Sequence, residues 1–220
     1  MRSKPQAAAP AAPTVIVIDD DEAVREALED LLDSVGLTVR SFPSVRQYAE
    51  LCPAVDVGCM VLDVRLPGRS GLDFQAELAR SGDSLPVIFI SGHADVPMCA
   101  RAMKAGAFEF LTKPVHHQEL LDAIHAAIAR HRERRDRERG LVTQRTRFGT
   151  LTPREREITL MVVSGLRNKQ IADDLGLSEA TVKLHRGQAM RKMAARSVVE
   201  LVRIVDGLVP QAVPQSDRRA

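Results

Sequence analysis

The sequence has little aromatic character and no hydrophobic run long enough to span a membrane. Trp is absent, Tyr occurs once, and 3% of the 220 residues are aromatic, which disfavours a stacking platform for single-stranded nucleic acid or sugars. No apolar run reaches the ~18 residues that a membrane helix needs. The three cysteines, Cys52, Cys59 and Cys99, are odd in number and lack metal-ligand spacing. We therefore expect a cytoplasmic protein with reduced thiols, and no secreted, disulfide-stapled or membrane protein.

The formal net charge of +2 is distributed unevenly along the chain. Residues 14–130 have a balance of −8, whereas residues 131–150 and 151–206 have balances of +4 and +3. A chain of this length has room for two small domains. An acidic body followed by a basic end indicates that these two domains have different partners.

Residues 14–130 alternate short apolar runs with amphipathic stretches. Short strands buried on both faces and separated by helices are typical of a parallel sheet that helices cover on both sides. Five such units predict an α/β flavodoxin-like fold with a doubly wound parallel five-stranded sheet. The predicted strands are residues 15–18, 37–42, 59–62, 86–90 and 107–111. The predicted helices are residues 24–35, 44–52, 71–80, 96–105 and 118–129.

The rest of the chain predicts a linker, a small helical domain and two flexible tails. Residues 131–148 are charged and polar, and they either extend the last helix of the first domain or form a solvated linker. Residues 140–150 break the helical pattern. Because residues 149–206 contain no strand pattern, we predict a small all-α domain there. Residues 1–13 and 207–220 are expected to be flexible tails.

Acidic residues follow two of the predicted strands. Asp19, Asp20 and Asp21 come directly after the first strand, and Asp63 comes directly after the third. Since ligands of an open parallel sheet bind beyond the carboxyl ends of its strands, these acids are expected to converge there. Clustered carboxylates raise one another's proton affinity or recruit a hard cation, and Mg²⁺ prefers such oxygen ligands. Helix capping explains Asp21 equally well, but it does not explain Asp63, which precedes a loop.

Polar residues also follow the last two predicted strands. Ser91 follows the fourth strand, and Lys113 follows the fifth. A lysine at this edge can pair with a carboxylate or an acyl phosphate, and Ser91 can donate its hydroxyl to the same oxygens. His93 has no second His or Cys at ligand spacing, so we interpret it as a loop or partner-facing residue.

Four motifs together resemble the receiver domain of bacterial response regulators: VIDDDEAVREAL, VLDVRLPGRSGLDF, ISGHADVPMCARAMKAGA and FEFLTKP. The resemblance covers roughly residues 14–130. It implies that a partner histidine kinase phosphorylates Asp63, with Lys113 and Ser91 as the catalytic partners of this phosphoacceptor. It also implies a cofactor, Mg²⁺ or Mn²⁺. The implied metal ligands are Asp19, Asp20, Asp63 and the backbone carbonyl of Arg65.

The same resemblance implies a conformational switch. Ser91 and Lys113 would move towards the phosphoryl group, and Phe110 would enter the space that Ser91 leaves. The peptide bond between Lys113 and Pro114 would be cis, as in the family. The affected surface would carry both signs of charge, which suits a symmetric dimer, although ordinary solvated helix faces explain the same charges. The expected dimer residues are Arg101, Lys104, Glu109, Glu119 and Asp122.

The predicted helical domain contains a helix-turn-helix candidate. Thr152 and Glu155 form a predicted capping box, and Pro153 suits the first helical position. A short helix over residues 168–175 is followed by a Gly-containing turn, and Ser178 is placed to cap the next helix.

The helix after this turn carries a basic face that suits the major groove of DNA. Its other face has Val182, Ala189 and Met193 as predicted core residues. Gly187 costs the helix ~1 kcal/mol relative to Ala, and it either permits a close approach to DNA or is a tolerated weak position. The sequence LTPREREITLMVVSGLRNKQIADDLGLSEATVKLHRGQAMRKM resembles the LuxR-type helix-turn-helix of the NarL/FixJ response regulators. The expected DNA-contacting residues are Thr181, Lys183, Leu184, His185, Arg186, Gly187, Gln188, Arg191 and Lys192.

These features predict a two-component response regulator that dimerises on phosphorylation and binds double-stranded DNA to control transcription. RNA polymerase is a further expected partner, and a membrane is not. We expect no enzyme activity apart from self-catalysed phosphoryl transfer to Asp63 and hydrolysis from it. An aspartyl phosphatase-like enzyme is a less favoured alternative, because it needs a second Asp where this chain has Arg65. The other alternative is a phosphorylation-independent DNA-binding regulator with a structural receiver.

Overall fold

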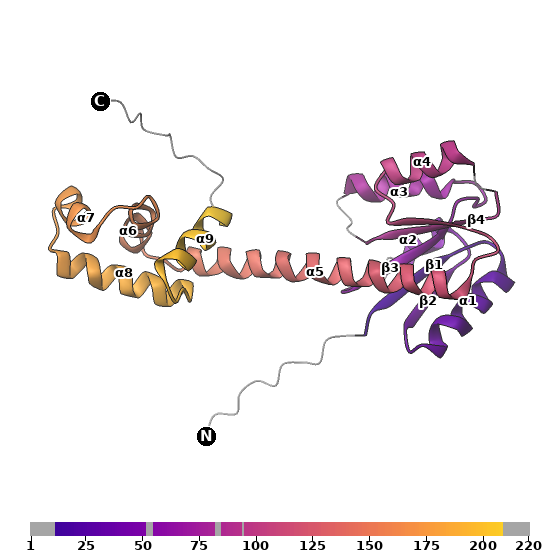
Figure 1. The fold of residues 1–220 in the computed structure, drawn as a ribbon, viewed down its shortest axis with the longest axis horizontal. Helices are drawn as coiled ribbons and strands as arrows, with labels where there is room; N and C mark the ends of the chain where they lie inside the picture. The colour runs from indigo at the N-terminus through magenta and orange to yellow at the C-terminus, as the bar shows by residue number, and fades with distance from the viewer. Residues whose placement is uncertain (1–11, 52–54, 82–84, 94, 209–220) are drawn as a thin grey trace, which may run out of the picture. The chain divides into compact units, whose positions relative to one another are not determined.

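The computed structural model describes residues 12–51, 55–81, 85–93 and 95–208. The chain divides into two compact units, residues 1–135 and 136–220 (Figure 1). Most of the two predicted tails lies outside the described residues, and so does Cys52 at the end of the second predicted helix.

The first unit contains one five-stranded parallel sheet with the strand order β2-β1-β3-β4-β5. This is the order of a flavodoxin-like doubly wound sheet, so the predicted fold class is confirmed. Each strand lies within one or two residues of its predicted position. The strands are β1 (Thr14–Ile18), β2 (Thr38–Phe42), β3 (Gly58–Asp63), β4 (Val87–Ser91) and β5 (Glu109–Thr112).

Helices cover both faces of this sheet. One buried cluster joins the sheet to residues such as Tyr48, Phe74 and Ala102, which belong to α2, α3 and α4. A second cluster on the opposite face joins it to Leu32 of α1 and Ile124 of α5. The helices are α1 (Glu22–Ser34), α2 (Val45–Leu51), α3 (Gly71–Ser81), α4 (Val96–Lys104) and α5 (His117–Gly149).

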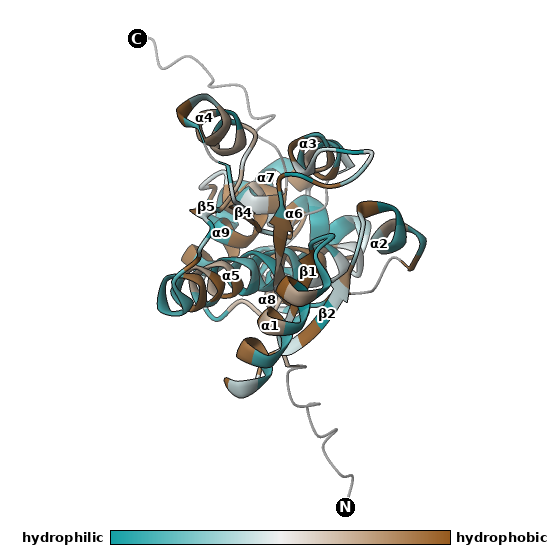
Figure 2. Ribbon diagram, turned by 90° about the vertical axis from the view of Figure 1, so that its right-hand side faces the viewer, coloured by the Kyte–Doolittle hydropathy of each residue, from teal (hydrophilic) through white to brown (hydrophobic). Residues whose placement is uncertain are grey.

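The inner strands β1, β3 and β4 are buried and largely hydrophobic on both faces. Ile16 and Phe89 point into one cluster, and Val17 and Ile88 point into the other. Strands β1 and β4 are accordingly coloured as hydrophobic, whereas α1 and α5 carry residues of both kinds (Figure 2). Burial on both faces excludes the alternating pattern of a half-exposed sheet, and it leaves the strand ends as the natural positions for polar groups.

Helix α5 is the longest element of the structure. It continues through residues 140–149, where the sequence pattern led us to expect a break. That expectation was wrong because a single glycine, Gly140, costs a helix only ~1 kcal/mol. The hydroxyls of Thr143 and Thr146 donate to the carbonyls of Arg139 and Val142, four residues earlier in the same helix. No helix among the described residues is both long and apolar enough to cross a membrane.

The second unit packs four helices around one apolar cluster that includes Ile158, Ile171, Val182 and Met193. The capping box of Thr152 and Glu155 is present, as predicted. Ser178 caps the third of these helices by accepting from the backbone N–H of Thr181 at 3.1 Å. The helices are α6 (Pro153–Val163), α7 (Asn168–Leu175), α8 (Glu179–Met193) and α9 (Val198–Leu208).

A buried histidine fixes α5 to the beginning of β3. His131 is 3% exposed, and its Nδ1 accepts a hydrogen bond from the backbone N–H of Gly58 at 3.0 Å. Gly58 tolerates no side chain there, because a Cβ would lie 1.9 Å from the carbonyl oxygen of Thr14. One turn later, the guanidinium of Arg135 donates to the carbonyl of Asp56 at 3.3 Å. The strand that ends in Asp63 is thus tied to α5 at its other end.

We predict that His131→Ala lowers the free energy of unfolding of the first unit by about 1–3 kcal/mol, because the buried N–H of Gly58 loses its acceptor. Urea unfolding followed by circular dichroism measures this loss. His125→Ala serves as the control, since His125 lies on an exposed part of the same helix. Equal stability of the two variants would contradict the prediction.

Candidate functional site

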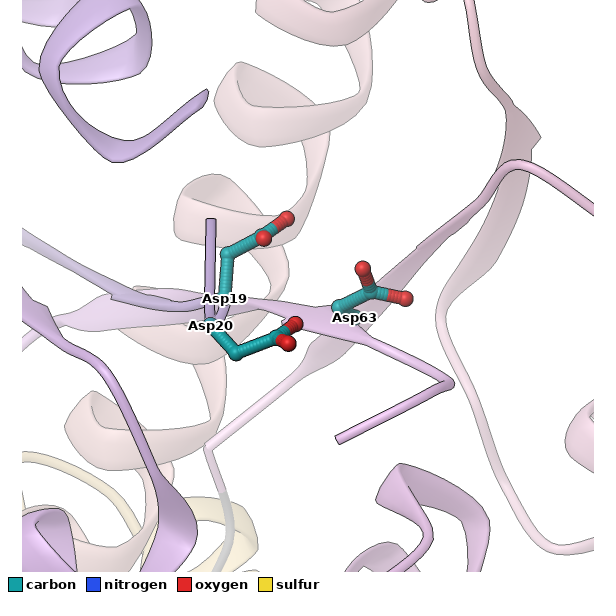
Figure 3. Close-up of side chains that lie close together, drawn as sticks. All are labelled: Asp19, Asp20 and Asp63. Carbon is teal, nitrogen blue, oxygen red and sulfur yellow. The ribbon is translucent and has the colours of Figure 1, made fainter. Parts of the chain in front are cut away.

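Three carboxylates meet at the carboxyl edge of the sheet. Asp19 and Asp20 directly follow β1, and Asp63 is the last residue of the neighbouring strand β3. Each of the three offers an oxygen, and these oxygens lie within 4.8 Å of one another (Figure 3). Asp19 and Asp63 are buried and Asp20 is exposed. The predicted convergence is therefore confirmed for these three acids, whereas Asp21 caps α1 by accepting from the backbone N–H groups of Ala23 and Val24.

The ammonium group of Lys113, just beyond β5, binds two of these carboxylates. Its Nζ donates to Oδ2 of Asp19 at 2.7 Å and to Oδ2 of Asp63 at 2.8 Å. Burial works to lower the pKa of Lys113, but the hydrogen bonds and charges of Asp19 and Asp63 outweigh it and raise that pKa. Lys113 therefore stays charged at neutral pH. Burial raises the pKa of Asp19, and the hydrogen bond from Lys113 opposes that rise.

Backbone groups hold the same two carboxylates from the other side. Oδ1 of Asp19 accepts from the N–H of Asp21 at 3.0 Å, and Oδ1 of Asp63 accepts from the N–H of Arg65 at 3.0 Å. Helix α3 begins against the strand end, since a Cβ on Gly71 would lie 2.3 Å from the carbonyl oxygen of Asp63. These contacts fix the orientation of the carboxylate groups of Asp19 and Asp63.

The donor set of this cluster suits a hard divalent cation. It consists of carboxylate oxygens alone, which are ligands that Mg²⁺ prefers. Three acids lie around one ammonium group, so the cluster keeps a net negative charge when all three acids are ionised. The residues present therefore fit the metal that the sequence implies.

Ser91 and Phe110 lie on the neighbouring strands β4 and β5. The buried hydroxyl of Ser91 donates to the carbonyl of His93 at 3.0 Å and accepts from the N–H of His93 at 3.3 Å. The half-buried ring of Phe110 lies 6.1 Å from the ring of Phe89. Ser91 thus forms its hydrogen bonds within its own loop. The bond between Lys113 and Pro114 is cis, as predicted.

A hollow of about 770 Å³ opens beside the acidic cluster, between the loop after Asp63 and helix α4. Asp20, Arg65, Met98 and Arg101 are among the residues that line it. Arg101 therefore borders this hollow, although the sequence suggested it for a dimer contact. All five expected dimer residues are exposed, namely Arg101, Lys104, Glu109, Glu119 and Asp122.

Helix α8 of the second unit has one buried and one open face. Val182, Ala189 and Met193 are buried in the core, as predicted. Leu184 is 57% exposed on the opposite face. The other expected contact residues that are exposed are Lys183, Gly187, Arg191 and Lys192, and the half-buried ones are Thr181, His185, Arg186 and Gln188.

Two of the expected DNA-contacting cations have partners on parts of the helical unit outside α8. Nη1 of Arg186 donates to Oδ1 of Asn168 at 2.8 Å. Nζ of Lys192 donates to Oε2 of Glu155 at 2.6 Å and to the carbonyl of Thr150 at 3.3 Å. Both side chains therefore connect α8 to other parts of the unit. Sequence spacing alone did not reveal these contacts.

Comparison with known proteins identifies both units. Residues 15–125 match the family described as the response regulator receiver domain, and residues 149–205 match the LuxR family of bacterial regulatory proteins. The chain belongs to the NarL/FixJ family of response regulators. This response regulator thus combines a receiver domain with a LuxR-type DNA-binding domain, and proteins of this family regulate transcription. A receiver domain implies a histidine kinase as a partner.

Several relatives resemble the regulator over most of their length. Nodulation protein W of Bradyrhizobium diazoefficiens is 50% identical over 194 residues, covering 88% of this chain and 86% of the relative. Response regulator protein TodT of Pseudomonas putida is 43% identical, covering 90% and 87%. The solved structure of response regulator StyR aligns with a TM-score of 0.80 at 44% identity, covering 89% of this chain and 99% of that one.

The contact between Lys192 and Glu155 predicts an acid-sensitive helical unit in the regulator. The hydrogen bond from Lys192, supported by the N–H of Thr152, lowers the pKa of Glu155 from its ordinary value of 4.5. A carboxyl group with a lowered pKa stabilises the fold above its unfolded-state pKa, and this contribution is lost as the pH falls through the folded-state pKa. We expect Glu155→Gln to destabilise this unit by about 1 kcal/mol near neutral pH and by less in acid.

Urea unfolding followed by the methyl NMR signal of Met193 measures this effect at neutral and at acid pH. Glu157→Gln is the control, because Glu157 lies on the same helix but pairs at the surface with Arg154. An equal loss of stability for Glu155→Gln at both pH values would contradict the prediction.

Proposed function

We propose that Asp63 is the phosphoacceptor of this regulator and that a histidine kinase phosphorylates it. The contact of one lysine, Lys113, with both buried carboxylates carries this proposal. A carboxylate is a weak nucleophile towards a phosphoryl group unless nearby charge is neutralised. Lys113 supplies such a charge within hydrogen-bonding distance of Asp63, at 2.8 Å.

In the proposed reaction an Oδ atom of Asp63 attacks the phosphorus atom in line with the leaving group. The new bond is O–P, and the bond that breaks is the N–P bond of the kinase phosphohistidine or the O–P bond of an acyl phosphate. The leaving group takes the electron pair. The backbone N–H of Arg65 orients the Asp63 carboxylate, and Lys113 stabilises charge on the transferred oxygens.

Asp19, Asp20, Asp63 and the carbonyl of Arg65 would hold Mg²⁺ or Mn²⁺ in this reaction. The cation supplies charge neutralisation for the phosphoryl oxygens. Lys113, Ser91 and the acids together would also catalyse phosphorylation by small acyl phosphates and the later hydrolysis, without other enzyme activity. The carboxylate donor set supports this assignment.

The phosphoryl group would then change the packing of β4 and β5. It brings negative charge and new acceptor oxygens beside Ser91 and Lys113. Ser91 would exchange its contact with His93 for the phosphoryl group, and Phe110 would follow into the space it leaves. The outcome is a new surface over α4, β5 and α5, where we place a symmetric homodimer contact.

We propose residues 14–130 as the receiver, 131–148 as a helical linker and 149–206 as the DNA-binding domain. A domain that binds DNA supports a cytoplasmic location for the regulator. Control of transcription makes RNA polymerase a further proposed partner. A dimer would present two copies of α8 to a two-fold site on double-stranded DNA. On each copy, the open face of Lys183, Leu184 and Gln188 suits base edges.

We predict that a small acyl phosphate with Mg²⁺ adds one phosphoryl group to the wild-type chain and none to Asp63→Asn, because the amide lacks the nucleophilic oxygen. Intact-mass spectrometry measures the incorporation. Asp30→Asn is the control, since Asp30 is an exposed acid on α1. Incorporation into Asp63→Asn at the wild-type level would refute the assignment.

We predict that Gly187→Ala stabilises the helical unit by ~1 kcal/mol yet weakens specific DNA binding. A Cβ at Gly187 meets nothing within 4 Å in the protein, so the substitution only improves helix propensity. On the open face of α8, however, the added methyl group would stand between the helix and the groove. We expect about a tenfold loss of affinity, equivalent to ~1.4 kcal/mol.

The DNA for this test is selected from a random pool by the wild-type regulator. Fluorescence anisotropy with this DNA measures the loss of affinity. Gly140→Ala is the control, because Gly140 lies within a helix and its Cβ would also meet nothing within 4 Å. Unchanged DNA affinity in Gly187→Ala would favour the interpretation of Gly187 as a tolerated weak position.

A further inference from the structure

Each polar group of Asp19 is held by a different part of the receiver. Its N–H donates to the carbonyl of Phe42 in β2 at 3.2 Å. Its two carboxylate oxygens accept from Asp21 N–H and Lys113 Nζ. Its carbonyl oxygen accepts from Nη1 of Arg25 at 2.8 Å. Through Arg25, helix α1 therefore binds the backbone carbonyl of Asp19.

Arg25 is well placed to fix the loop between β1 and α1. It lies in the first turn of α1 and is half-buried. Its backbone N–H donates to the carbonyl of Asp21 at 3.1 Å, while its guanidinium reaches back to Asp19. The loop that carries the acids is thus held by both the backbone and the side chain of one residue.

The held carbonyl belongs to the peptide unit that joins Asp19 to Asp20. Because a peptide unit is planar, fixing this carbonyl also fixes the position of the backbone nitrogen and Cα of Asp20. Within the described part of the chain, no hydrogen bond or ion pair involves the carboxylate of Asp20, so its direction depends on this backbone. The contact from Arg25 therefore fixes the backbone position from which the side chain of Asp20, an exposed member of the acidic cluster, extends.

We propose that Arg25 is a positioning residue for the divalent-cation site of the receiver. It aligns Asp19 and Asp20 through the peptide unit between them and does not itself touch the cation. This role rests on the proposed metal site at Asp19, Asp20 and Asp63. Residues that orient metal ligands in this way typically change metal affinity by about 10–100-fold when they are removed.

The sign of the effect separates positioning from simple electrostatics. Arg25 carries a positive charge near the acidic cluster. If it acted only through that charge, its removal would reduce repulsion and tighten the binding of Mg²⁺. If it positions the ligands, its removal weakens the binding of Mg²⁺ although the site becomes more negative.

Isothermal titration of the full chain with MgCl₂ tests the role of Arg25. We expect Arg25→Ala to bind Mg²⁺ about 10–100-fold more weakly than the wild type. Arg25→Lys should recover part of the affinity, because its ammonium group keeps one donor for the Asp19 carbonyl. Arg46→Ala is the matched control, since it removes an equal charge from an exposed residue of α2.

Equal or tighter binding by a folded Arg25→Ala variant would overturn the proposal. If circular dichroism shows that this variant is unfolded, Arg25→Met takes its place, because it removes both the charge and the donor while keeping a long unbranched side chain, and the same weakening of Mg²⁺ binding is expected. Failure of the wild-type chain to bind Mg²⁺ would overturn the metal site itself and this role with it. Normal wild-type binding with unaffected Arg25 variants would overturn the role of Arg25 alone.

Discussion

The shared ammonium group of Lys113 is the interaction on which the receiver site depends. Two buried carboxylates, Asp19 and Asp63, lie close enough to repel each other, and burial deprives them of water. The lysine offsets both effects at once, at 2.7 and 2.8 Å. The same contact joins the ends of β1, β3 and β5, because Lys113 reaches past the intervening strand β4. A change of charge on Asp63 therefore alters a contact that extends across the sheet.

The hydrophobic sheet explains why the polar groups of the receiver core gather at the ends of its strands. Its inner strands β1, β3 and β4 are covered on both faces, so the buried charges of this sheet gather where those strands end, at the carboxyl edge. At the opposite edge, His131 and Arg135 of α5 bind the start of β3. Helix α5 begins shortly after Lys113 and continues to Gly149 without a break. This helix thus begins close in sequence to Lys113 and contacts the start of β3 at the opposite edge of the sheet.

Much of the fold and the acidic site could be predicted from the sequence, because they depend on local patterns. Apolar runs marked the strands, and the acids after them had to meet once the strands were parallel. The contacts of Arg25 and Lys192 could not be found in this way, since each depends on where a long side chain reaches in the folded protein. Arg25 lies six residues after Asp19, which is the only local signal of its role. The helical path through Gly140 was missed because one glycine costs less than the surrounding helix contributes.

Coupling between the acidic edge and the DNA-binding helix is tested most directly by the DNA affinity of the full chain with and without beryllofluoride and Mg²⁺. Beryllofluoride mimics a phosphoryl group on an aspartate, so it probes the state of Asp63 without a slow chemical step. The receiver assigned here should bind its selected DNA more tightly when beryllofluoride is present, and Asp63→Asn should not respond. An equal DNA affinity of the wild-type chain in both conditions would contradict a phosphorylation-controlled output and favour a structural receiver.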